Sequence, residues 1–395
     1  QSWNPGQNII LQKNPNYFRS TEGLPHFEQL VFRFVGENTN NNIAATMSGE
    51  CDVVEKIENI AYTTLAELQN NGRLNTIVGQ KATWEHLDFG INPASYDDGY
   101  DPGDDRPAFF SDTRTRQGIM MCLDRPGAME AITFGLSELM HTYLPAQHPL
   151  FNPKAVQYFY NPSNGIAFLE AAGWILGEDS VRVADSVVGV PDGTRFSINY
   201  MARDTRRNQQ IMDIFTASLA SCGIEIIPDL IPPVDYYLEG PRGRLFGRDF
   251  DLAQYAWRAK AIPVCNYWAS NTIPGEDRLL ISEVPWLTTA LSEKGNDEAV
   301  AFPFDWKGWN AGGYASSNFD FACNAAGISI SGQNNYIENH HLAQIIFTNE
   351  LPIIPLFPQI QMAVSRPDLC GFSLDPTAAS PFWNIESYGI GLLCQ

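Results

Sequence analysis

The segment "TRFSINYMARDTRRNQQIMDIFTASLASCGIEIIP", residues 194–228, predicts three consecutive elements. Residues 194–202 alternate like a strand with one buried face. Residues 204–223 predict a helix with one apolar face that ends at Gly223, and residues 224–228 predict a second strand. Strand, helix and strand in this order are typical of an α/β architecture in which helices cover a sheet. The apolar face of the helix consists of Ile211, Ile214, Phe215 and Leu219.

Similar signals predict further elements on both sides of this segment. A helix over 334–350 ends before Pro352, since proline cannot continue a helix. Residues 95–107 are rich in Gly, Pro and Asp and predict a loop or a lobe boundary. The apolar stripe of the helix over 334–350 consists of Ile337, Leu342, Ile345 and Ile346. The other expected elements are helices over 61–72, 111–125 (N-cap Ser111 or Asp112) and 163–174 (N-cap Ser163, stop Gly173), and strands over 8–12, 29–35 and 84–92.

Length and charge restrict the classes of function. A chain of 395 residues is too long for one ordinary core, so we expect two or more lobes. The chain has 45 acidic and 25 basic residues, a formal net charge of -20. Because this charge repels phosphate backbones and anionic lipid, it argues against nucleic acid and membrane surfaces as partners. No run of about eighteen apolar residues predicts a membrane span.

The seven cysteines contain no C-x-x-C pair, which argues against zinc or redox-motif chemistry. Their odd number leaves at least one thiol free. Cys370 and Cys394 are close enough in sequence for a disulfide worth ~3 kcal/mol by loop entropy. Separate buried thiols are the equal alternative.

Nine motifs spread over nearly the whole chain occur in the order seen in one protein family. The chain resembles the extracellular solute-binding proteins of the dipeptide and oligopeptide type (family 5), the ligand-capturing subunits of ABC importers. The motifs are "PGQNIILQKNPNYF" (5–18), "FEQLVFRFV" (27–35), "MSGECDVVE" (47–55), "FSDTRTRQGIMMCLDR" (110–125), "LEAAGW" (169–174), "FDLAQYAW" (250–257), "WNAGGYASSNFD" (309–320), "ELPIIPLF" (350–357) and "WNIESY" (383–388).

This resemblance implies a type II periplasmic-binding-protein-like fold, in which two mixed α/β lobes close on a ligand by hinge motion. Residues 1–92 and 361–395 would form an incomplete lobe I, since an N-terminal stretch precedes the first motif in the family. Residues 93–360 would form lobe II. The implied protein is a monomer without enzymatic activity or cofactor. It would be extracellular or periplasmic, anchored by a lipid at the missing N-terminus, and would deliver a peptide or other mid-sized solute to an ABC permease.

The family tryptophan that follows the "FDLA" strand lines the ligand cleft, which makes Trp257 the leading candidate contact. Indole offers a rigid apolar face with one donor. Peptide binders of the family carry an aspartate three residues later, whereas this chain has Lys260. Like charges ~4 Å apart cost about 4 kcal/mol at an effective dielectric near 20, so Lys260 argues against a ligand held by a free amine. Lys260 and Arg258 together can receive a carboxylate or phosphate.

Other candidate contacts are Gln254 in the same strand, and Trp309, Asn310 and Tyr314 in a glycine-hinged loop. Each candidate has a structural alternative. Trp257 can be a core residue at a strand end, Arg258 and Lys260 can reach solvent, and Tyr314 can dock against its own lobe.

The stretch "DDGYDPGDD" (97–105) contains five aspartates and is a weak calcium candidate, with a solvated acidic loop as the alternative. The aspartates are Asp97, Asp98, Asp101, Asp104 and Asp105.

Two other classes of function stay open. A sensor would present the ligand to a receptor instead of a permease. A secreted glycoside hydrolase would use paired carboxylates beside aromatic platforms. No G-x-S-x-G, H-E-x-x-H or phosphate-loop motif supports enzymatic activity.

Overall fold

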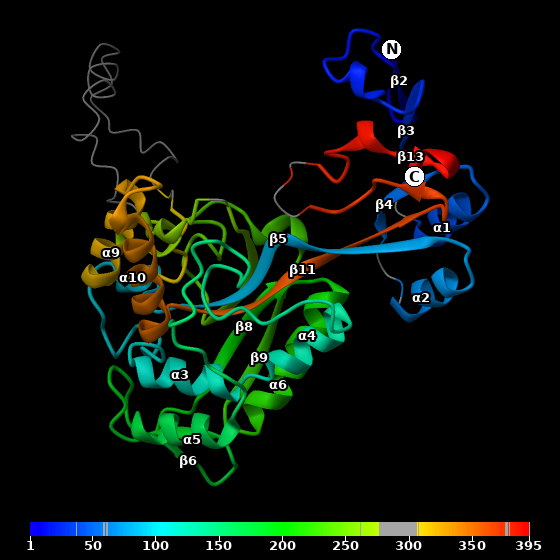
Figure 1. The fold of residues 1–395 in the computed structure, drawn as a ribbon. Coiled ribbons are helices and arrows are strands. Elements are labelled where there is room, and N and C mark those ends of the chain that lie inside the picture. The colour runs from blue at the N-terminus through cyan, green and yellow to red at the C-terminus, as the bar shows by residue number, and fades with distance from the viewer. Residues whose placement is uncertain are drawn as a thin grey trace, which may run out of the picture. The chain divides into compact units, whose positions relative to one another are not determined.

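The computed structural model describes residues 1–36, 38–57, 60, 62–260, 262–275, 306, 308–375, 378 and 380–394. The chain divides into two compact units, each with its own hydrophobic core. Unit 1 comprises residues 1–82 and 359–395, and unit 2 comprises residues 83–358 (Figure 1). Within the described ranges, no helix has the length and apolar character that crossing a bilayer requires.

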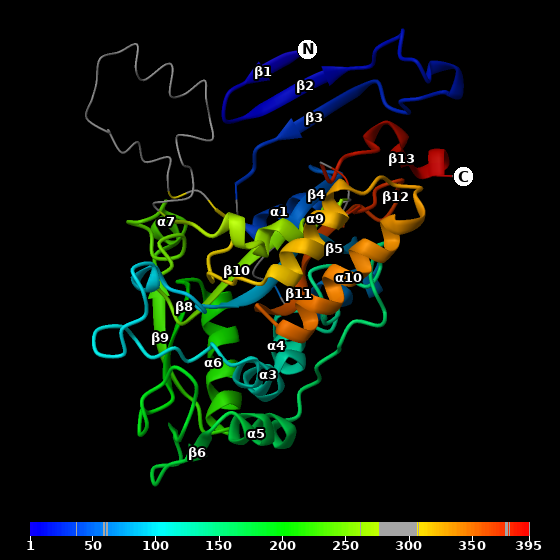
Figure 2. The same cartoon turned by 90° about the vertical axis from the view of Figure 1, so that its left-hand side faces the viewer.

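Unit 2 contains a sheet with the strand order β11-β5-β10-β8-β9. The parallel strands β8 (Ser197–Arg203) and β9 (Glu225–Ile231) are joined by α6 (Arg206–Ala220), which confirms the elements predicted over 194–228. Figure 2 shows α6 running beside β8, and both strands contact this helix. The predicted apolar face of α6 lies in the core, with Ile211, Phe215 and Leu219 buried and Ile214 partly buried. The other strands are β5 (Asn75–Phe89), β10 (Leu252–Arg258) and β11 (Ile353–Ser365).

Helix caps in unit 2 agree with the sequence prediction at one helix and differ at another. α3 (Thr113–Cys122) has Asp112 as its N-cap, one of the two predicted residues. The predicted N-cap Ser163 is wrong, because Asn161 accepts a hydrogen bond from the backbone N–H of Asn164 and starts α5 two residues earlier. The remaining long helices are α4 (Arg125–Thr133), α5 (Pro162–Ala171), α9 (Ser317–Ile328) and α10 (Asn334–Glu350).

The apolar stripe predicted for α10 is wrong for two of its four residues, while Ile345 and Ile346 are partly buried. Ile337 and Leu342 are 52% and 42% exposed, whereas Gln344 is fully buried. The Gln344 side chain donates to the carbonyl oxygen of Leu150 at 2.7 Å and accepts from the backbone N–H of Asn152 at 3.0 Å. These hydrogen bonds offset the cost of burying an amide, so α10 packs through a polar residue that apolar periodicity does not reveal.

Aromatic packing dominates the main core of unit 2. The rings of Trp174 and Phe196 stack with centroids 3.8 Å apart at an interplanar angle of 8°. The Trp174 Nε1–H donates to Thr115 Oγ1 at 3.1 Å, which satisfies the one polar group of this fully buried side chain.

Arg125 is also fully buried, and its guanidinium joins three segments that are distant in sequence. Nη1 donates to the carbonyl oxygens of Met140 (3.0 Å) and Pro355 (2.8 Å), and Nη2 donates to that of Tyr158. Burial lowers the pKa of Arg125 to about 9, so the group stays charged at neutral pH and depends on these carbonyl partners.

Unit 1 contains a small antiparallel sheet and a second group of elements packed on a small core. Strands β1 (Ser2–Asn4), β2 (Asn8–Gln12) and β3 (Gln29–Arg33) form the sheet, and none of their residues is buried. The strand predicted over 29–35 thus ends at Arg33, which leaves Phe34 outside it and 51% exposed. The core lies between α1 (Thr39–Met47), α2 (Tyr62–Asn70), β4 (Val53–Ile57) and the end of β11 that pairs with β4. The C-terminal segment adds β12 (Leu369–Cys370) and β13 (Gly389–Ile390).

Six of the seven cysteines form disulfides. The bridge between Cys370 and Cys394 in unit 1 is confirmed, and the alternative of separate thiols is wrong. Cys51 is free, as the odd number of cysteines requires. The other bridges, which the sequence did not reveal, are Cys122–Cys222 and Cys265–Cys323 in unit 2.

Candidate functional site

The candidate residue Trp257 stands near the end of β10, which pairs antiparallel with β5. In this register Trp257 lies opposite Trp84, and Tyr255 lies opposite His86. Since side chains alternate along a strand, these four residues share one face of the sheet. Gln254 belongs to the other face.

Trp257 joins two other rings to form what we call the aromatic cluster: Trp257, Tyr267 and Trp309. The Trp257 centroid lies 4.8 Å from that of Tyr267 and 5.5 Å from that of Trp309. Trp257 and Tyr267 are partly buried, and Trp309 is 47% exposed. Lys260 Nζ lies 5.8 Å from the Tyr267 centroid, close enough for a cation–π contact. The cluster therefore presents apolar ring surface beside a cation.

Buried polar groups support the cluster from within unit 2. The His86 ring is stacked against Trp257 with centroids 6.3 Å apart at 20°. His86 Nδ1 lies 2.8 Å from Asp88 Oδ1, and the other carboxylate oxygen of Asp88 accepts from the Tyr255 hydroxyl. All three side chains are at most 1% exposed. Such a network restricts the ring positions behind Trp257.

Sequence reasoning missed His86, Asp88 and Tyr267. The first two occupy alternate positions of the strand predicted over 84–92, so period-2 analysis was the signal that could have placed them on the face of Trp84. For Tyr267 the chain offers no comparable signal, because it lies in a short helical turn, Cys265–Trp268.

Three of the other candidates are buried in unit 2. Gln254 is fully buried, and its Oε1 accepts from the Tyr200 hydroxyl at 2.6 Å. Asn310 donates to the carbonyl oxygens of Ala269 and Tyr314, so it holds its own loop together. The Tyr314 hydroxyl donates to Glu350 Oε2 at 2.6 Å, and burial raises the pKa of this tyrosine. The structure thus brings Trp257, Trp309 and Lys260 together and gives Gln254, Asn310 and Tyr314 interior partners.

Arg258 is exposed at the end of β10. Strand alternation places it on the face opposite Trp257. Lys260, which follows the strand, is the predicted cation that approaches the cluster.

The acidic loop uses several of its aspartates for internal contacts. Asp97 pairs with Arg248. Asp101 Oδ1 and Asp105 Oδ2 accept backbone hydrogen bonds from Gly103 and Asp101, both at 2.8 Å. In the described part of the chain, no three His, Cys, Asp or Glu side chains gather in a way that could hold a metal ion, and this covers the candidates Asp98 and Asp104.

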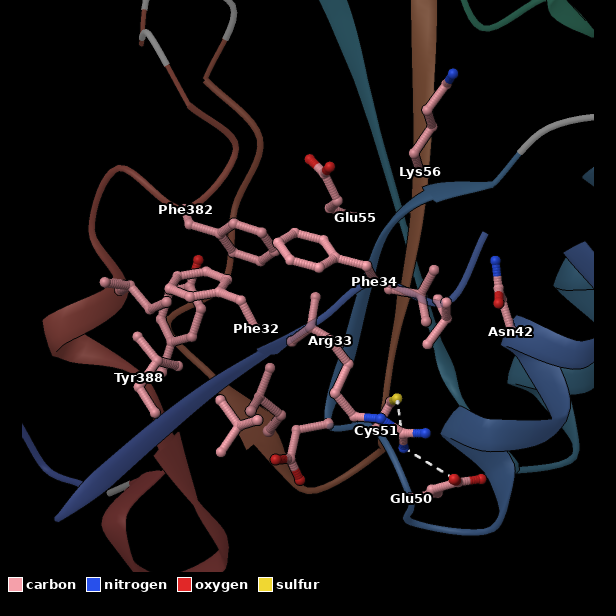
Figure 3. Close-up of a pocket in the computed structure, with 18 of the residues that line it drawn as sticks. Phe32, Arg33, Phe34, Asn42, Glu50, Cys51, Glu55, Lys56, Phe382 and Tyr388 are labelled. Carbon is pink, nitrogen blue, oxygen red and sulfur yellow. Dashed lines mark hydrogen bonds and ion pairs between the residues drawn. The ribbon is translucent and has the colours of Figure 1, made fainter. Parts of the chain in front are cut away.

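Unit 1 contains a cavity of about 810 Å³ that sequence reasoning missed. It is lined by β3 and the residues after it, by β4, and by the C-terminal segment (Figure 3). We call it the β3–β4 groove. No sequence signal could have found it, because strands that do not pair with each other form its walls.

Comparison with known proteins identifies the family and the fold. The sequence model described as "Bacterial extracellular solute-binding proteins, family 5 Middle" matches residues 1–276. The "Peptide transport periplasmic protein SapA" of Salmonella typhimurium is 23% identical over 385 residues, which cover 98% of this chain and 57% of that protein. "Heme-binding protein A" of Haemophilus influenzae is 20% identical and is covered to the same 57%. The chain thus spans somewhat more than half the length of these curated relatives.

Solved structures confirm the predicted periplasmic-binding-protein-like fold. HbpA2 from Haemophilus parasuis gives a TM-score of 0.69 at 16% identity, covering 99% of this chain and 63% of that one. The oligopeptide-binding protein from Thermus thermophilus, solved with a pentapeptide, gives 0.65 at 22% identity, covering 98% and 61%. At these sequence identities, the structural similarity establishes the fold of the chain but does not identify its ligand.

Proposed function

We propose that this chain, which belongs to the bacterial extracellular solute-binding proteins of family 5, captures a mid-sized solute for an ABC-type importer without chemical conversion. The family match over residues 1–276 supports a role in solute binding. The aromatic cluster is the main structural observation in favour of the proposal, because it offers a surface that a solute can contact. Partly exposed indole and phenol rings, held by a buried His86–Asp88–Tyr255 network, offer a preorganised apolar contact surface.

The lobes of this binding protein would be residues 1–92 with 361–395, and residues 93–360. Family 5 solute-binding proteins are extracellular or periplasmic, and we extend that location to this chain, acting as a monomer with a lipid anchor. The three disulfides support an oxidising compartment, where such bridges persist.

The solute class follows from Lys260. A cation beside the aromatic cluster attracts a carboxylate or phosphate and repels the α-ammonium of a free peptide. We therefore expect an anionic or N-blocked oligopeptide-like solute that contributes apolar surface to Trp257 and Trp309.

Isothermal titration calorimetry with three pools of acidic peptides tests the function. The peptides of one pool are N-acetylated, those of the second have free termini, and those of the third are C-amidated. Binding of the acetylated acidic pool should weaken at least tenfold in Trp257→Ala, because the variant removes ring area from the contact surface. Trp383→Ala is the matched control, since Trp383 is 50% exposed in unit 1 and is not part of the cluster. Equal binding by both variants, or hydrolysis of a chromogenic glycoside by the wild-type chain, would contradict the proposal.

Lys260→Gln separates charge from packing in the same titration. If Lys260 anchors an anion, this variant loses affinity for the acetylated acidic pool and gains affinity for free peptides. If both pools bind as they do to the wild-type chain, Lys260 is only a solvated residue.

A further inference from the structure

Lys260, the cation beside the aromatic cluster, lies outside the sheet that carries Trp257. β10 ends at Arg258, so Lys260 follows the residues that pair with β5. A lysine side chain is a point charge on a flexible four-carbon stem, and its ammonium stays in one place only where its backbone is fixed. The position of Lys260 Nζ, 5.8 Å from the Tyr267 centroid, therefore depends on contacts outside the sheet.

His148, which is partly buried, provides such a contact. Its Nε2 lies 3.2 Å from the carbonyl oxygen of Lys260, which is 112 residues later in the chain. The backbone N–H of Leu150 donates to Nδ1 of the same ring at 3.1 Å. A ring nitrogen that accepts a hydrogen bond carries no proton, so the neutral imidazole has its proton on Nε2. His148 therefore donates this proton to the Lys260 carbonyl oxygen.

The loop that carries His148 is fixed on α10. The side chain of the fully buried Gln344 donates to the carbonyl oxygen of Leu150 and accepts from the backbone N–H of Asn152. The Asn152 side chain in turn donates to the carbonyl oxygen of His341 at 3.1 Å. Because these hydrogen bonds are buried or partly buried, they hold the loop firmly. The His148 ring can thus restrain the segment that it reaches.

The aromatic partner of Lys260 is held independently. Tyr267 lies in the helical turn Cys265–Trp268, and Cys265 forms a disulfide with Cys323 of α9. Trp268, the neighbour of Tyr267, is only 1% exposed. The ring side of the cation–π contact is therefore held by the interior of unit 2. The backbone of the lysine is the side whose position a neighbouring residue can set.

We propose that His148 is a positioning residue. By donating its Nε2–H to the Lys260 carbonyl oxygen, it fixes the ammonium beside the aromatic cluster and thereby sets the preference of the site for anionic solutes. Coulomb energy depends on distance, so a fixed ammonium separates a carboxylate from an ammonium on the solute better than a mobile one does. The effect on solutes rests on the proposed function, whereas the positioning of Lys260 does not.

Reductive methylation of the lysines with isotopically labelled formaldehyde tests the positioning by NMR without any solute. Methylation keeps the charge of lysine, and Lys260→Gln identifies the signal of Lys260 by its loss. In the wild-type chain the Tyr267 ring should shift this methyl signal upfield. In His148→Ala the signal should move to the position of a solvent-exposed lysine, whereas the matched His148→Gln retains a side-chain donor and should keep the shift. An unchanged signal in His148→Ala would overturn the proposal.

Calorimetry with the acetylated and the free peptide pools tests the effect on solutes. His148→Ala should weaken binding of the acetylated pool about fivefold, as expected for one lost hydrogen bond, and strengthen binding of the free pool. His148→Gln should restore both affinities.

Combining His148→Ala with Lys260→Gln shows whether the histidine acts through the lysine. The double variant should bind both pools as Lys260→Gln does, and additive losses would contradict the proposal. Suppose instead that Lys260→Gln binds like the wild-type chain while the methyl signal still depends on His148. The proposed solute class is then wrong, and the positioning of Lys260 stands.

Should His148→Ala fail to fold, the wild-type chain provides the test. Long-range proton–nitrogen NMR spectra of the chain with labelled histidines show which ring nitrogen carries the proton, and His148→Gln assigns the signal. At mildly alkaline pH, where imidazole is neutral, the proton of His148 should be on Nε2. A proton on Nδ1 would refute the proposal, because Nε2 would then have no proton to donate to Lys260.

Discussion

The two units differ in the size of their hydrophobic cores and in how many of their residues are buried. Unit 2 buries stacked rings such as Trp174 and Phe196 in a large core and closes two disulfides. Unit 1 has one small core, a three-stranded sheet without a buried residue, and a groove flanked by free strand edges. The difference teaches that packing in the core contributes far more to the stability of unit 2 than to that of unit 1.

The largest expected effect comes from breaking the interior of unit 2. Trp174→Ala should lower the free energy of unfolding by about 5 kcal/mol, because it removes a fully buried stacked ring and a hydrogen bond. Urea denaturation followed by near-ultraviolet circular dichroism measures this loss. Trp3→Ala in unit 1 is the control, since Trp3 is 69% exposed. A loss below about 1 kcal/mol at Trp174 would contradict the view of unit 2 as a tightly packed body.

The second effect concerns the long disulfide loop of unit 2. Replacing Cys122 and Cys222 by alanine opens a loop of 100 residues and should cost about 5 kcal/mol. The matched pair in unit 1, Cys370 and Cys394, closes 24 residues, and its loss should cost about 1 kcal/mol less by loop entropy. Thermal unfolding of both double variants gives the order, and a reversed order would contradict the comparison.

Acid should weaken unit 2 through His141. Burial, with a smaller contribution from the charge of Arg125, lowers the pKa of His141 to about 4, below its ordinary value of 6.5. Between pH 6.5 and 4 the unfolded chain therefore binds a proton that the folded chain does not. The free energy of unfolding should fall as the pH drops through this window, by up to about 2 kcal/mol since the ring is only partly buried. His141→Asn should remove that part of the pH dependence in urea titrations, and an unchanged profile would refute it.

The smallest expected effect lies in unit 1. Phe34→Ser should change the free energy of unfolding by no more than about 0.5 kcal/mol, because the ring is 51% exposed. A large loss of stability would mean that Phe34 is part of a core, and the contrast between the units would then narrow.

Sequence reasoning succeeded where local rules decide the structure. The face of α6 and the cap Asp112 follow from apolar periodicity and side-chain capping, which act within a few residues. The cap of α5 was missed because both Asn161 and Ser163 can cap a helix, and the choice depends on where the chain enters it.

The structural features that were not predicted depend on contacts with residues that are distant in sequence. Gln344 is buried because of Leu150 and Asn152, which are nearly two hundred residues earlier in the chain. The partner of Cys122 is 100 residues away, and the β3–β4 groove combines segments from both ends of the chain. Of the candidate site, Trp257, Trp309 and Lys260 came together, whereas Gln254 points to the other face of its strand because it is an odd number of residues from Trp257.

The carbonyl partners of Arg125 have a consequence for biosynthesis. One of them, Pro355, is made 230 residues after the arginine. Until the ribosome has released that segment, burying the guanidinium would leave part of it without acceptors, at a cost of several kcal/mol. The arginine therefore delays the completion of unit 2 until the strand that carries Pro355 has been synthesised.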